Sequence, residues 1–378
     1  MVHFCFISSV FGREDALIVY RQGISLAKAG YKVSFLLCDG KPKETRHGIE
    51  MISIADYQPT QWKRVLFNRG KIKDYLNKTG YKADIFQISE PELLPLGSFL
   101  KKRGFKVVFN LREYYPEYFA LKFKNKLVRK LVHDGLESYF RHVSKKYDAV
   151  FNCMPEMHDY IKHVMPCRYF EDLPNFPVVN KDFSLKFDEY SKRENIISYF
   201  GTIYSISCQE EFLSAIDGIP NVRYLLAGVI NEDYKARLMS MPAWSKVTFK
   251  NGFTREELPG IINCSIMGNV MKDFSKTETP EGSFSIIKIF ESMEAAIPVI
   301  LAKVPLYEEL VKKYNCGICV DPHNVQEIRD AIIYLLNNKK EAYEMGQNGR
   351  RAVIEEFSWN SYESKYLNVI KQLIESKV

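Results

Sequence analysis

A regular alternation of short apolar runs with amphipathic stretches, repeated along most of the chain, constrains its fold more than any other feature. Residues 3–8 favour a buried strand, residues 15–29 a helix capped by Asp15, and residues 32–38 a second strand. Such alternation predicts βαβ units and a parallel sheet. The same pattern predicts further strands over residues 84–88, 106–110 and 148–153.

The alternation fails over residues 173–194, where Pro174, Pro177 and many charges predict a linker. It then resumes and predicts strands over residues 195–200, 222–228, 246–249, 266–270, 298–301 and 317–320. The length of 378 residues also exceeds that of one usual domain. We therefore predict an α/β protein whose two doubly wound parallel-sheet (Rossmann-like) domains, residues 1–172 and 195–358, face a cleft that binds the ligand, with a closing helix in residues 359–378.

The composition is that of an ordinary globular protein, with 46% apolar and 26% charged residues, and it excludes wholesale disorder. Eight cysteines are scattered singly, so a disulfide scaffold is excluded and free thiols are expected. The first residues lack a basic segment and a cleavage site, so we expect no signal peptide. No apolar run approaches the ~18 residues of a membrane span. A cytoplasmic protein is expected.

The net charge is unevenly distributed. Residues 1–172 carry 29 Lys plus Arg against 19 Asp plus Glu, a net charge of +10, whereas the remainder has a net charge of −3. This asymmetry suggests that the first domain faces an anionic partner: nucleic acid, an acidic membrane surface or a phosphorylated acceptor. The ordinary alternative is a basic surface without a partner.

Several familiar chemistries lack their motifs. The chain contains no GxGxxG, no GxxxxGK[ST], no GxSxG and no HExxH. His158 and His163 are five residues apart on a predicted helix and cannot share a face as metal ligands, while Cys316 and Cys319 are expected in the core. No Asp-x-Asp pair occurs either. We therefore predict no metal site and no cofactor, so any nucleotide is held without a metal ion.

The segment that carries the clearest chemistry is 281–301, EGSFSIIKIFESMEAAIPVIL. Glu281 and the glycine after it end a polar loop, and a helix is predicted from near Ser283. Free N–H groups and the helix dipole at such a terminus bind anions. Ser283 and Ser285 add hydroxyl donors, and the Lys288 ammonium can reach a phosphate bound there.

Glu291 lies three residues after Lys288, on the same helix face. A carboxylate at that position suits a vicinal diol such as ribose, because it accepts two hydrogen bonds. The alternative is a plain surface ion pair between these two side chains.

The order of motifs resembles glycosyltransferase family 4, a retaining family with the GT-B fold. Lys-x-x-Glu followed by a small-residue helix end and Pro-Val-Ile is similar to its C-terminal domain. YFGTI, RYLLAG, NGFTREELPGIINCS, CGICVDPHNVQEIRDAIIYLL and EMGQNGRRAVIEEFSW resemble its other segments. GISLAKAGYKVSFL, ADIFQISEPELLPLGSFL, KVVFNLREYYPEY and EDLPNFP resemble a subgroup of surface-polysaccharide assembly (capsule, O-antigen or exopolysaccharide). In this fold the last helix crosses back to the first domain.

The resemblance implies a donor site for a nucleotide-diphosphate sugar, with UDP favoured over GDP. Lys288 would bind the diphosphate and Glu291 the ribose, Gly201 and Thr202 would lie under the phosphates, and Gly252 with Phe253 beside the base. The family's Arg and Lys after the glycine turn are replaced here by Thr202 and the stretch 205–209. Further cations could come from Arg255, Lys272 or Lys276. Ser283 stands where the family has a first Glu, and Glu281 is the nearest substitute.

The resemblance also implies a metal-independent, retaining transfer to a hydroxyl of a glycan or lipid-linked glycan, in which the leaving diphosphate takes the acceptor proton. The acceptor-side residues expected in the first domain are Gly12, Glu90, Glu92, Arg112 and Glu113. Surface charge at strand ends is the alternative for these. The alternative functions are a sugar-nucleotide 2-epimerase of GT-B fold and a non-catalytic GT-B partner subunit.

Residues 119–133, FALKFKNKLVRKLVH, predict one basic amphipathic helix. Its cations are Lys122, Lys126, Arg129, Lys130 and His133, and its apolar stripe is Phe123, Leu127 and Leu131. Such a helix suits an anionic membrane surface, and therefore a peripheral place on the inner face of the cell membrane. The alternative is a helix that packs its stripe on the sheet of the first domain.

Overall fold

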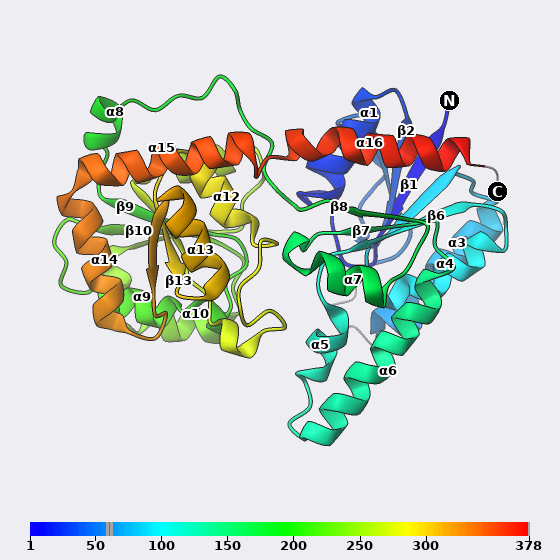
Figure 1. Cartoon of the computed structure of the whole chain (residues 1–378), viewed down its shortest axis with the longest axis horizontal. Coiled ribbons are helices and arrows are strands. Elements are labelled where there is room, and N and C mark those ends of the chain that lie inside the picture. The colour runs from blue at the N-terminus through cyan, green and yellow to red at the C-terminus, as the bar shows by residue number, and fades with distance from the viewer. Residues whose placement is uncertain (58–59, 61–62, 377–378) are drawn as a thin grey trace. The chain divides into compact units, whose positions relative to one another are not determined.

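The computed structural model describes residues 1–57, 60 and 63–376, which form two α/β units (Figure 1). The first unit comprises Met1–Asn175 together with the chain from Trp359 onward, and the second comprises Phe176–Ser358. The stretch predicted as a linker divides between them. Most of it packs with the second unit, because its helix α8 (Phe187–Ser191) buries Tyr190, whose hydroxyl donates to the carbonyl of Ile266 at 2.8 Å.

The first unit is built on an eight-stranded sheet of order β3-β4-β2-β1-β5-β6-β7-β8. All neighbours are parallel except β3 and β4, which form an edge hairpin. The five strands predicted in this half are confirmed. The strands are β1 (His3–Ile7), β2 (Lys32–Leu37), β3 (Glu44–Arg46), β4 (Ile49–Ser53), β5 (Ile85–Ile88), β6 (Lys106–Leu111), β7 (Ala149–Asn152) and β8 (Tyr169–Asp172).

The helices of the first unit cover this sheet and include one from the far end of the chain. Asp15 caps the first of them through backbone N–H groups of Leu17 and Ile18 at 3.1 and 2.8 Å. In the helix that begins at Trp359, the indole of Trp359 donates to the hydroxyl of Ser25 at 3.0 Å. The helices are η1 (Ile18–Gly23), α1 (Ile24–Lys28), η2 (Arg64–Asn68), α3 (Arg69–Thr79), η3 (Pro91–Leu93), α4 (Leu94–Lys101), α5 (Tyr115–Ala120), α6 (Lys126–Ser144), η4 (Pro155–Met157), α7 (His158–Val164) and α16 (Trp359–Glu375).

The second unit has a six-stranded parallel sheet of order β11-β10-β9-β12-β13-β14. All six predicted strands are confirmed: β9 (Ile196–Phe200), β10 (Arg223–Gly228), β11 (Val247–Asn251), β12 (Met267–Val270), β13 (Val299–Ala302) and β14 (Gly317–Val320). Besides α8, its helices are η5 (Ser205–Ser207), α9 (Gln209–Ile216), α10 (Glu232–Met239), η6 (Pro242–Lys246), α11 (Leu258–Asn263), η7 (Phe274–Lys276), α12 (Ile287–Glu294), α13 (Pro305–Tyr314), α14 (Val325–Asn337) and α15 (Lys339–Glu355).

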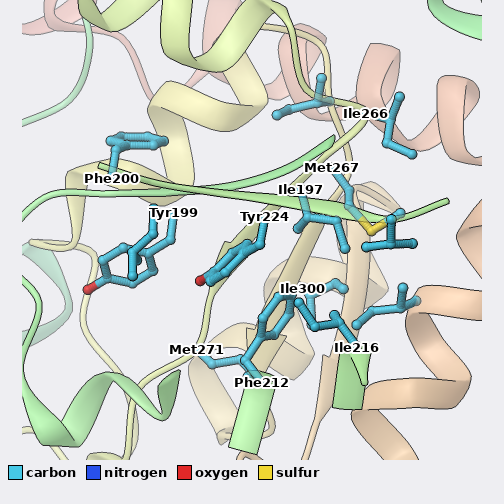
Figure 2. Packing of buried hydrophobic residues seen from close by; sticks show 14 of the residues in the cluster. Ile197, Tyr199, Phe200, Phe212, Ile216, Tyr224, Ile266, Met267, Met271 and Ile300 are labelled. Carbon is cyan, nitrogen blue, oxygen red and sulfur yellow. The ribbon is translucent and has the colours of Figure 1, made fainter. Parts of the chain in front are cut away.

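Helices cover both faces of this sheet, so its inner strands β9, β12 and β13 are buried along almost their whole length. Figure 2 shows Tyr199 and Phe200 on opposite sides of β9, with Tyr224 and Phe212 on the Tyr199 side. The rings of Phe212 and Tyr224 lie 4.7 Å apart between centroids. Burial on both faces explains why β9 and β13 are largely apolar runs in the sequence.

Candidate functional site

Three glycines stand at the carboxyl ends of three adjacent strands of the second unit. Gly201 follows β9, Gly228 ends β10 and Gly252 follows β11, with φ of 116°, 151° and 72°. The amide of Gly201 donates to Ala227 at 3.0 Å, and that of Gly252 to Gly228 at 3.2 Å. A Cβ on Gly228 would lie 1.7 Å from the Gly201 carbonyl oxygen. This edge is therefore bare backbone, which a ligand can approach closely.

The edge coincides with the point where the strand order reverses. From β9 the chain proceeds to β10 on one side, whereas from β12, the other neighbour of β9, it proceeds to β13 on the opposite side. Helix α12 makes the β12–β13 connection, so it starts at the same sheet edge as Gly201. Open α/β sheets bind their ligands at such a switch point.

The predicted start of this helix near Ser283 is wrong, because α12 begins at Ile287. The hydroxyls of Ser283 and Ser285 lie 2.8 Å apart, and the Ser285 amide donates to the Ser283 hydroxyl at 3.1 Å. Tyr307 donates to the Ser283 carbonyl at 2.8 Å. These bonds hold residues 283–285 in a turn rather than in the first turn of the helix, so both hydroxyls lie in the loop that enters α12.

Lys288, the second residue of α12, lies beside the glycine turn. Its ammonium donates to the hydroxyl of Tyr199 at 2.7 Å and lies 4.0 Å from the centre of that ring. Tyr199 in turn donates to the carbonyl of Thr202 at 3.0 Å. A Cβ built on Gly201 would lie 3.3 Å from the Lys288 nitrogen. The structure thus brings together the predicted phosphate cation and the predicted phosphate turn.

Glu291 is 5% exposed and forms an ion pair with Arg255, which is 19% exposed. Glu291 and Lys288 thus each have a partner from a different strand end: Arg255 for the carboxylate and Tyr199 for the ammonium. Arg255 follows β11 and the Gly252 turn, so this ion pair ties that turn to α12. A largely buried Arg–carboxylate pair can present both donors and acceptors to a ligand that carries hydroxyls.

The remaining predicted donor residues lie around this edge with different exposure. Phe253 packs edge-on against Phe200 with 6.5 Å between ring centres, and Thr202 is exposed. Glu281 is exposed too, and its carbonyl accepts from the amide of Leu306 at 3.1 Å. Its carboxylate stays a predicted substitute for the family's first Glu.

Two lysines were further predicted sources of positive charge. Lys276 pairs with Asp273 at 2.6 Å, and Lys272 lies 5.2 Å from the ring centre of Phe274. Arg255 and Lys276 are thus both compensated by carboxylates. Lys288 instead has a neutral phenol as its partner, which leaves its charge available to an anion.

A buried polar chain beneath the site was not predicted. Tyr224 donates to the Gln209 side chain at 2.6 Å and accepts from Asn269 at 2.9 Å. Asn269 also accepts from the amide of Met271 at 3.1 Å, which holds the loop after β12. In the sequence, these hydrogen-bonded residues appear only as single polar residues in or near apolar runs. Gln209 and Tyr224 are 15 residues apart and Tyr224 and Asn269 are 45 apart, so no local pattern indicates that they meet.

The first unit gathers its predicted acceptor-side carboxylates at the carboxyl ends of β1 and β5. Glu90 is buried and accepts from the Ser8 hydroxyl and from the amides of Ser9 and Val10, both at 3.2 Å. Burial raises the pKa of Glu90 to about 7. Glu92, also buried, accepts from Ser9 at 3.1 Å and from Arg64 at 2.9 Å.

The other predicted acceptor-side residues are arranged around β1 and β6. Arg112 donates to Asp15 at 2.9 Å and lies 4.0 Å from the ring centre of Phe11. The Gly12 carbonyl accepts from the Asp15 amide at 3.1 Å. Glu113 is exposed. Arg112 is thus fixed by its contacts with Asp15 and Phe11, whereas the side chain of Glu113 lies at the surface.

The single helix predicted over residues 119–133 is wrong, because α5 ends at Ala120 and α6 begins at Lys126, capped by Asn125. The two helices lie side by side, and α6 extends beyond the sheet of its unit (Figure 1). Residues 122–131 are all exposed, with Leu127 and Leu131 exposed by 68% and 65%. The expected alternative, packing of this stripe on the sheet, is therefore not observed for them. In the described chain no helix is long and apolar enough to cross a membrane.

Metal-ligating side chains also meet in the second unit, although none was predicted to. The ligand atoms of Cys208, Glu211 and His323 all lie within 4.8 Å of one another. The histidine comes 112 residues after the glutamate, so no local spacing could have indicated the cluster. His158, considered from the sequence, instead pairs with Asp172 at 2.6 Å.

Comparisons with known proteins agree with this architecture. Residues 182–352 match the family described as "Glycosyl transferases group 1". Among curated proteins, sucrose-phosphate synthase 4 of Arabidopsis thaliana is 31% identical and the MMP alpha-(1->4)-mannosyltransferase of Mycolicibacterium hassiacum 29% identical, each over 85 residues. The match covers 22% of this chain and only 8% and 21% of those two proteins.

Solved structures match over the whole chain. Sucrose-phosphate synthase from Thermosynechococcus elongatus superposes with a TM-score of 0.72 at 18% identity, covering 100% of both chains. Anabaena Alr3699/HepE, solved with UDP and glucose, gives 0.71 at 14% identity, covering 98% of this chain and 100% of its own. WaaG, a glycosyltransferase involved in lipopolysaccharide biosynthesis, gives 0.70 at 14% identity, covering 98% and 99%. The chain therefore has the GT-B fold, and residues 182–352, which lie in its second unit, are similar to the glycosyl transferases group 1 family.

Proposed function

We propose that this protein is a glycosyltransferase that moves a sugar from a nucleotide-diphosphate donor to a hydroxyl of a glycan or lipid-linked glycan. The observation that carries the proposal is the Lys288 ammonium, held by Tyr199 beside the bare backbone of Gly201. A diphosphate bound at this edge would contact the Lys288 ammonium and could approach the backbone at Gly201 closely. Phosphate groups in proteins are recognised by such cations and backbone N–H groups. The UDP in the complex of Anabaena HepE favours a UDP-sugar as the donor.

The proposed reaction retains the configuration at the sugar and needs no metal ion. The bond between the anomeric carbon and the phosphate oxygen breaks, and the acceptor oxygen bonds to that carbon on the same face. The acceptor proton passes to the leaving phosphate oxygen. The task of Lys288 is to stabilise the negative charge that grows on the diphosphate, which is the kind of term that preorganised charges supply best.

The acceptor is proposed to be a surface polysaccharide precursor. The motifs of the first domain resemble the subgroup that assembles such glycans, and the structurally similar WaaG is involved in lipopolysaccharide biosynthesis. The buried Glu90 and Glu92 and the guanidinium of Arg112 are the polar groups at the strand ends of the first unit that would meet acceptor hydroxyls.

The exposed residues 122–131, which include the start of α6, support a place on an anionic membrane. Leu127, Leu131 and the exposed Phe123 offer apolar area, while Lys124 and Lys126 add positive charge beside them. An apolar stripe flanked by lysines binds the interface of anionic bilayers. The protein would then work on the inner face of the cell membrane, where lipid-linked glycans are exposed.

Nucleotide binding tests the donor proposal directly. UDP at 100 times its dissociation constant stabilises the protein by about 2.7 kcal/mol, which a thermal-shift measurement detects. We expect a larger rise in Tm with UDP than with GDP, a much smaller rise in Lys288→Ala, and an unchanged rise in Lys312→Ala, which alters an exposed lysine of α13. Absence of any nucleotide effect would contradict the proposal and favour a non-catalytic role.

Product analysis separates transfer from epimerisation. The donor incubated alone should stay unchanged, and a glycosylated product should form only with acceptor present. Conversion of the donor to an isomeric nucleotide sugar without acceptor would replace the proposal with the 2-epimerase reaction.

Vesicle sedimentation tests the membrane part. The full chain should pellet with anionic but not with neutral liposomes. The double variant Leu127→Ser/Leu131→Ser should lose this binding, while Ile354→Ser, a matched change of an exposed residue in α15, should keep it. Equal binding to both vesicle types, or none, would overturn the membrane proposal without affecting the donor site.

A further inference from the structure

Three side chains able to bind a metal converge beside the second sheet, outside the donor site. Cys208 and Glu211 lie at the start of α9, and His323 lies between β14 and α14. Their sulfur, oxygen and nitrogen atoms are mutually within 4.8 Å. Around a tetrahedral zinc ion, ligand atoms are separated by about 3.3–3.7 Å, as its bond lengths require. Side-chain shifts of about 1 Å would therefore close these three groups around one ion.

The imidazole of His323 is oriented for this task. Its Nδ1 lies 3.0 Å from the Glu211 carboxylate, and its Nε2 lies 3.3 Å from the carboxylate of Asp273. Metal-bound histidines commonly donate their second N–H to a carboxylate, which fixes the tautomer and raises the basicity of the ligating nitrogen. Asp273 is buried and suited to that role. Asp273 is itself held in place by Lys276, at 2.6 Å, and by the hydroxyl of Ser275, at 2.5 Å.

We propose that the Cys208 thiolate, the Glu211 carboxylate and Nδ1 of His323 bind one zinc ion per chain, with Asp273 as the positioning residue. Thiolate, imidazole and carboxylate together are a donor set that zinc prefers over magnesium or calcium. Binding forms one bond from the metal to each ligand and releases the thiol proton, and any proton on Nδ1, to solvent. A water molecule completes the tetrahedron.

The ion and the Asp273–His323 contact would join three segments that follow β9, β12 and β14. Asp273 belongs to the loop between β12 and α12, and its amide donates to the carbonyl of Ile206 in η5 at 2.7 Å. The same loop leads to α12 and Lys288. Zinc would thus hold this loop against the start of α9 and take no part in the bond changes at the sugar. The inference is independent of the proposed transfer reaction.

The competing explanation is an ion pair in which protonated His323 lies between Glu211 and Asp273. It accounts for the two carboxylate contacts and leaves the thiol of Cys208 as a donor to the carbonyl of Ile206 at 3.6 Å. Replacement of Cys208 therefore separates the two explanations. His323 is half exposed, so His323→Ala tests the site with little risk to folding.

Cobalt and zinc titrations of the full chain, first freed of metal by a chelator, test the proposal. We expect one equivalent of zinc by elemental analysis, and with Co²⁺ a near-ultraviolet thiolate-to-cobalt charge-transfer band. Cys208→Ser should lose the band, His323→Ala should lose stoichiometric binding, and Asp273→Asn should weaken binding by about 10- to 100-fold. Cys264→Ser, a matched change of an exposed cysteine, should leave both unchanged.

Three results would overturn the proposal. They are the absence of stoichiometric binding at micromolar metal, a cobalt band that survives in Cys208→Ser, and zinc binding that is unchanged in His323→Ala. In the first case the cluster is an ion pair only. None of these outcomes bears on nucleotide binding, so failure here is distinguishable from failure of the proposed transferase.

Discussion

The ammonium of Lys288 lies above the ring of Tyr199, 4.0 Å from its centre, and donates to its hydroxyl at 2.7 Å. Tyr199 belongs to β9 and Lys288 to α12, so one contact sets the distance between the strand that leads into the glycine turn and the helix that carries the cation. A cation above a ring is held without being neutralised. Its charge therefore remains available to an anion.

Lys288→Ala should lower the turnover rate more than it weakens donor binding. The charge on the leaving diphosphate grows toward the transition state, and loss of one such preorganised group costs about 10²- to 10³-fold in rate. Steady-state kinetics with varied donor, alongside direct nucleotide titration, measure the two effects. A turnover rate within twofold of the wild type would lead us to abandon this phosphate site.

Glu291→Ala should mainly weaken donor binding, because ribose hydroxyls change little during the reaction. Loss of a hydrogen bond to a charged group is worth about 1.5–3 kcal/mol, or about 10- to 150-fold in affinity. Glu291→Gln keeps the shape and one acceptor oxygen, so its donor affinity should lie between that of the wild type and that of Glu291→Ala. Glu291 is nearly buried and paired with Arg255, so its replacement also lowers the stability of the fold. The titrations are therefore done at a temperature well below the Tm of each variant. A fall in turnover rate with unchanged affinity would contradict the assigned role.

Gly228→Ala should destabilise the second unit and impair donor binding together. The added methyl would lie 1.7 Å from the Gly201 carbonyl oxygen, so the glycine turn must move. We expect a loss of about 2 kcal/mol or more in unfolding free energy. Gly260→Ala, in α11 with open space around it, should instead stabilise by about 0.5–1 kcal/mol. Similar unfolding midpoints in urea for the two variants would refute this account.

Glu90→Gln should gain stability over the wild type as the pH rises. Burial raises the pKa of Glu90 to about 7, above its value in the unfolded chain. The folded state therefore binds the extra proton below that pH, and the stability that this proton contributes is lost as the pH rises through about 7. Between about pH 5 and pH 8 the difference in unfolding free energy should change by about 2–3 kcal/mol. Glu113→Gln, an exposed control, should show a flat difference, and a flat profile for Glu90→Gln would contradict the prediction.

Sugar transfer should continue in the presence of a chelator, because in the proposed reaction Lys288 and the backbone of the glycine turn supply the electrostatic stabilisation. The chain contains no Asp-x-Asp pair for a nucleotide-bound metal. The measurement compares initial rates in EDTA with rates in added magnesium. Complete loss of activity in EDTA that magnesium restores would show that the transfer depends on a metal.

Features that depend on near neighbours in the chain could be predicted from the sequence. Apolar runs in the sequence predicted the strands, and Asp15 before an amphipathic run predicted a cap, which its bond from the Ile18 amide bears out. The βαβ order predicted that the helix carrying Lys288 starts at the edge of the sheet where the strands end. Local errors arose where side chains compete with the backbone. Ser283 and Ser285 form a turn that delays α12 to Ile287.

Only the tertiary structure decided which distant groups meet. Arg255 reaches Glu291 across 36 residues, and His323 reaches Glu211 across 112, because both pairs depend on the order of strands in the sheet and not on spacing along the chain. It also decided that Leu127 and Leu131 face solvent, since the periodicity of a helix shows an apolar stripe but not what covers it. Sequence patterns thus determine the elements, and long-range packing determines the site.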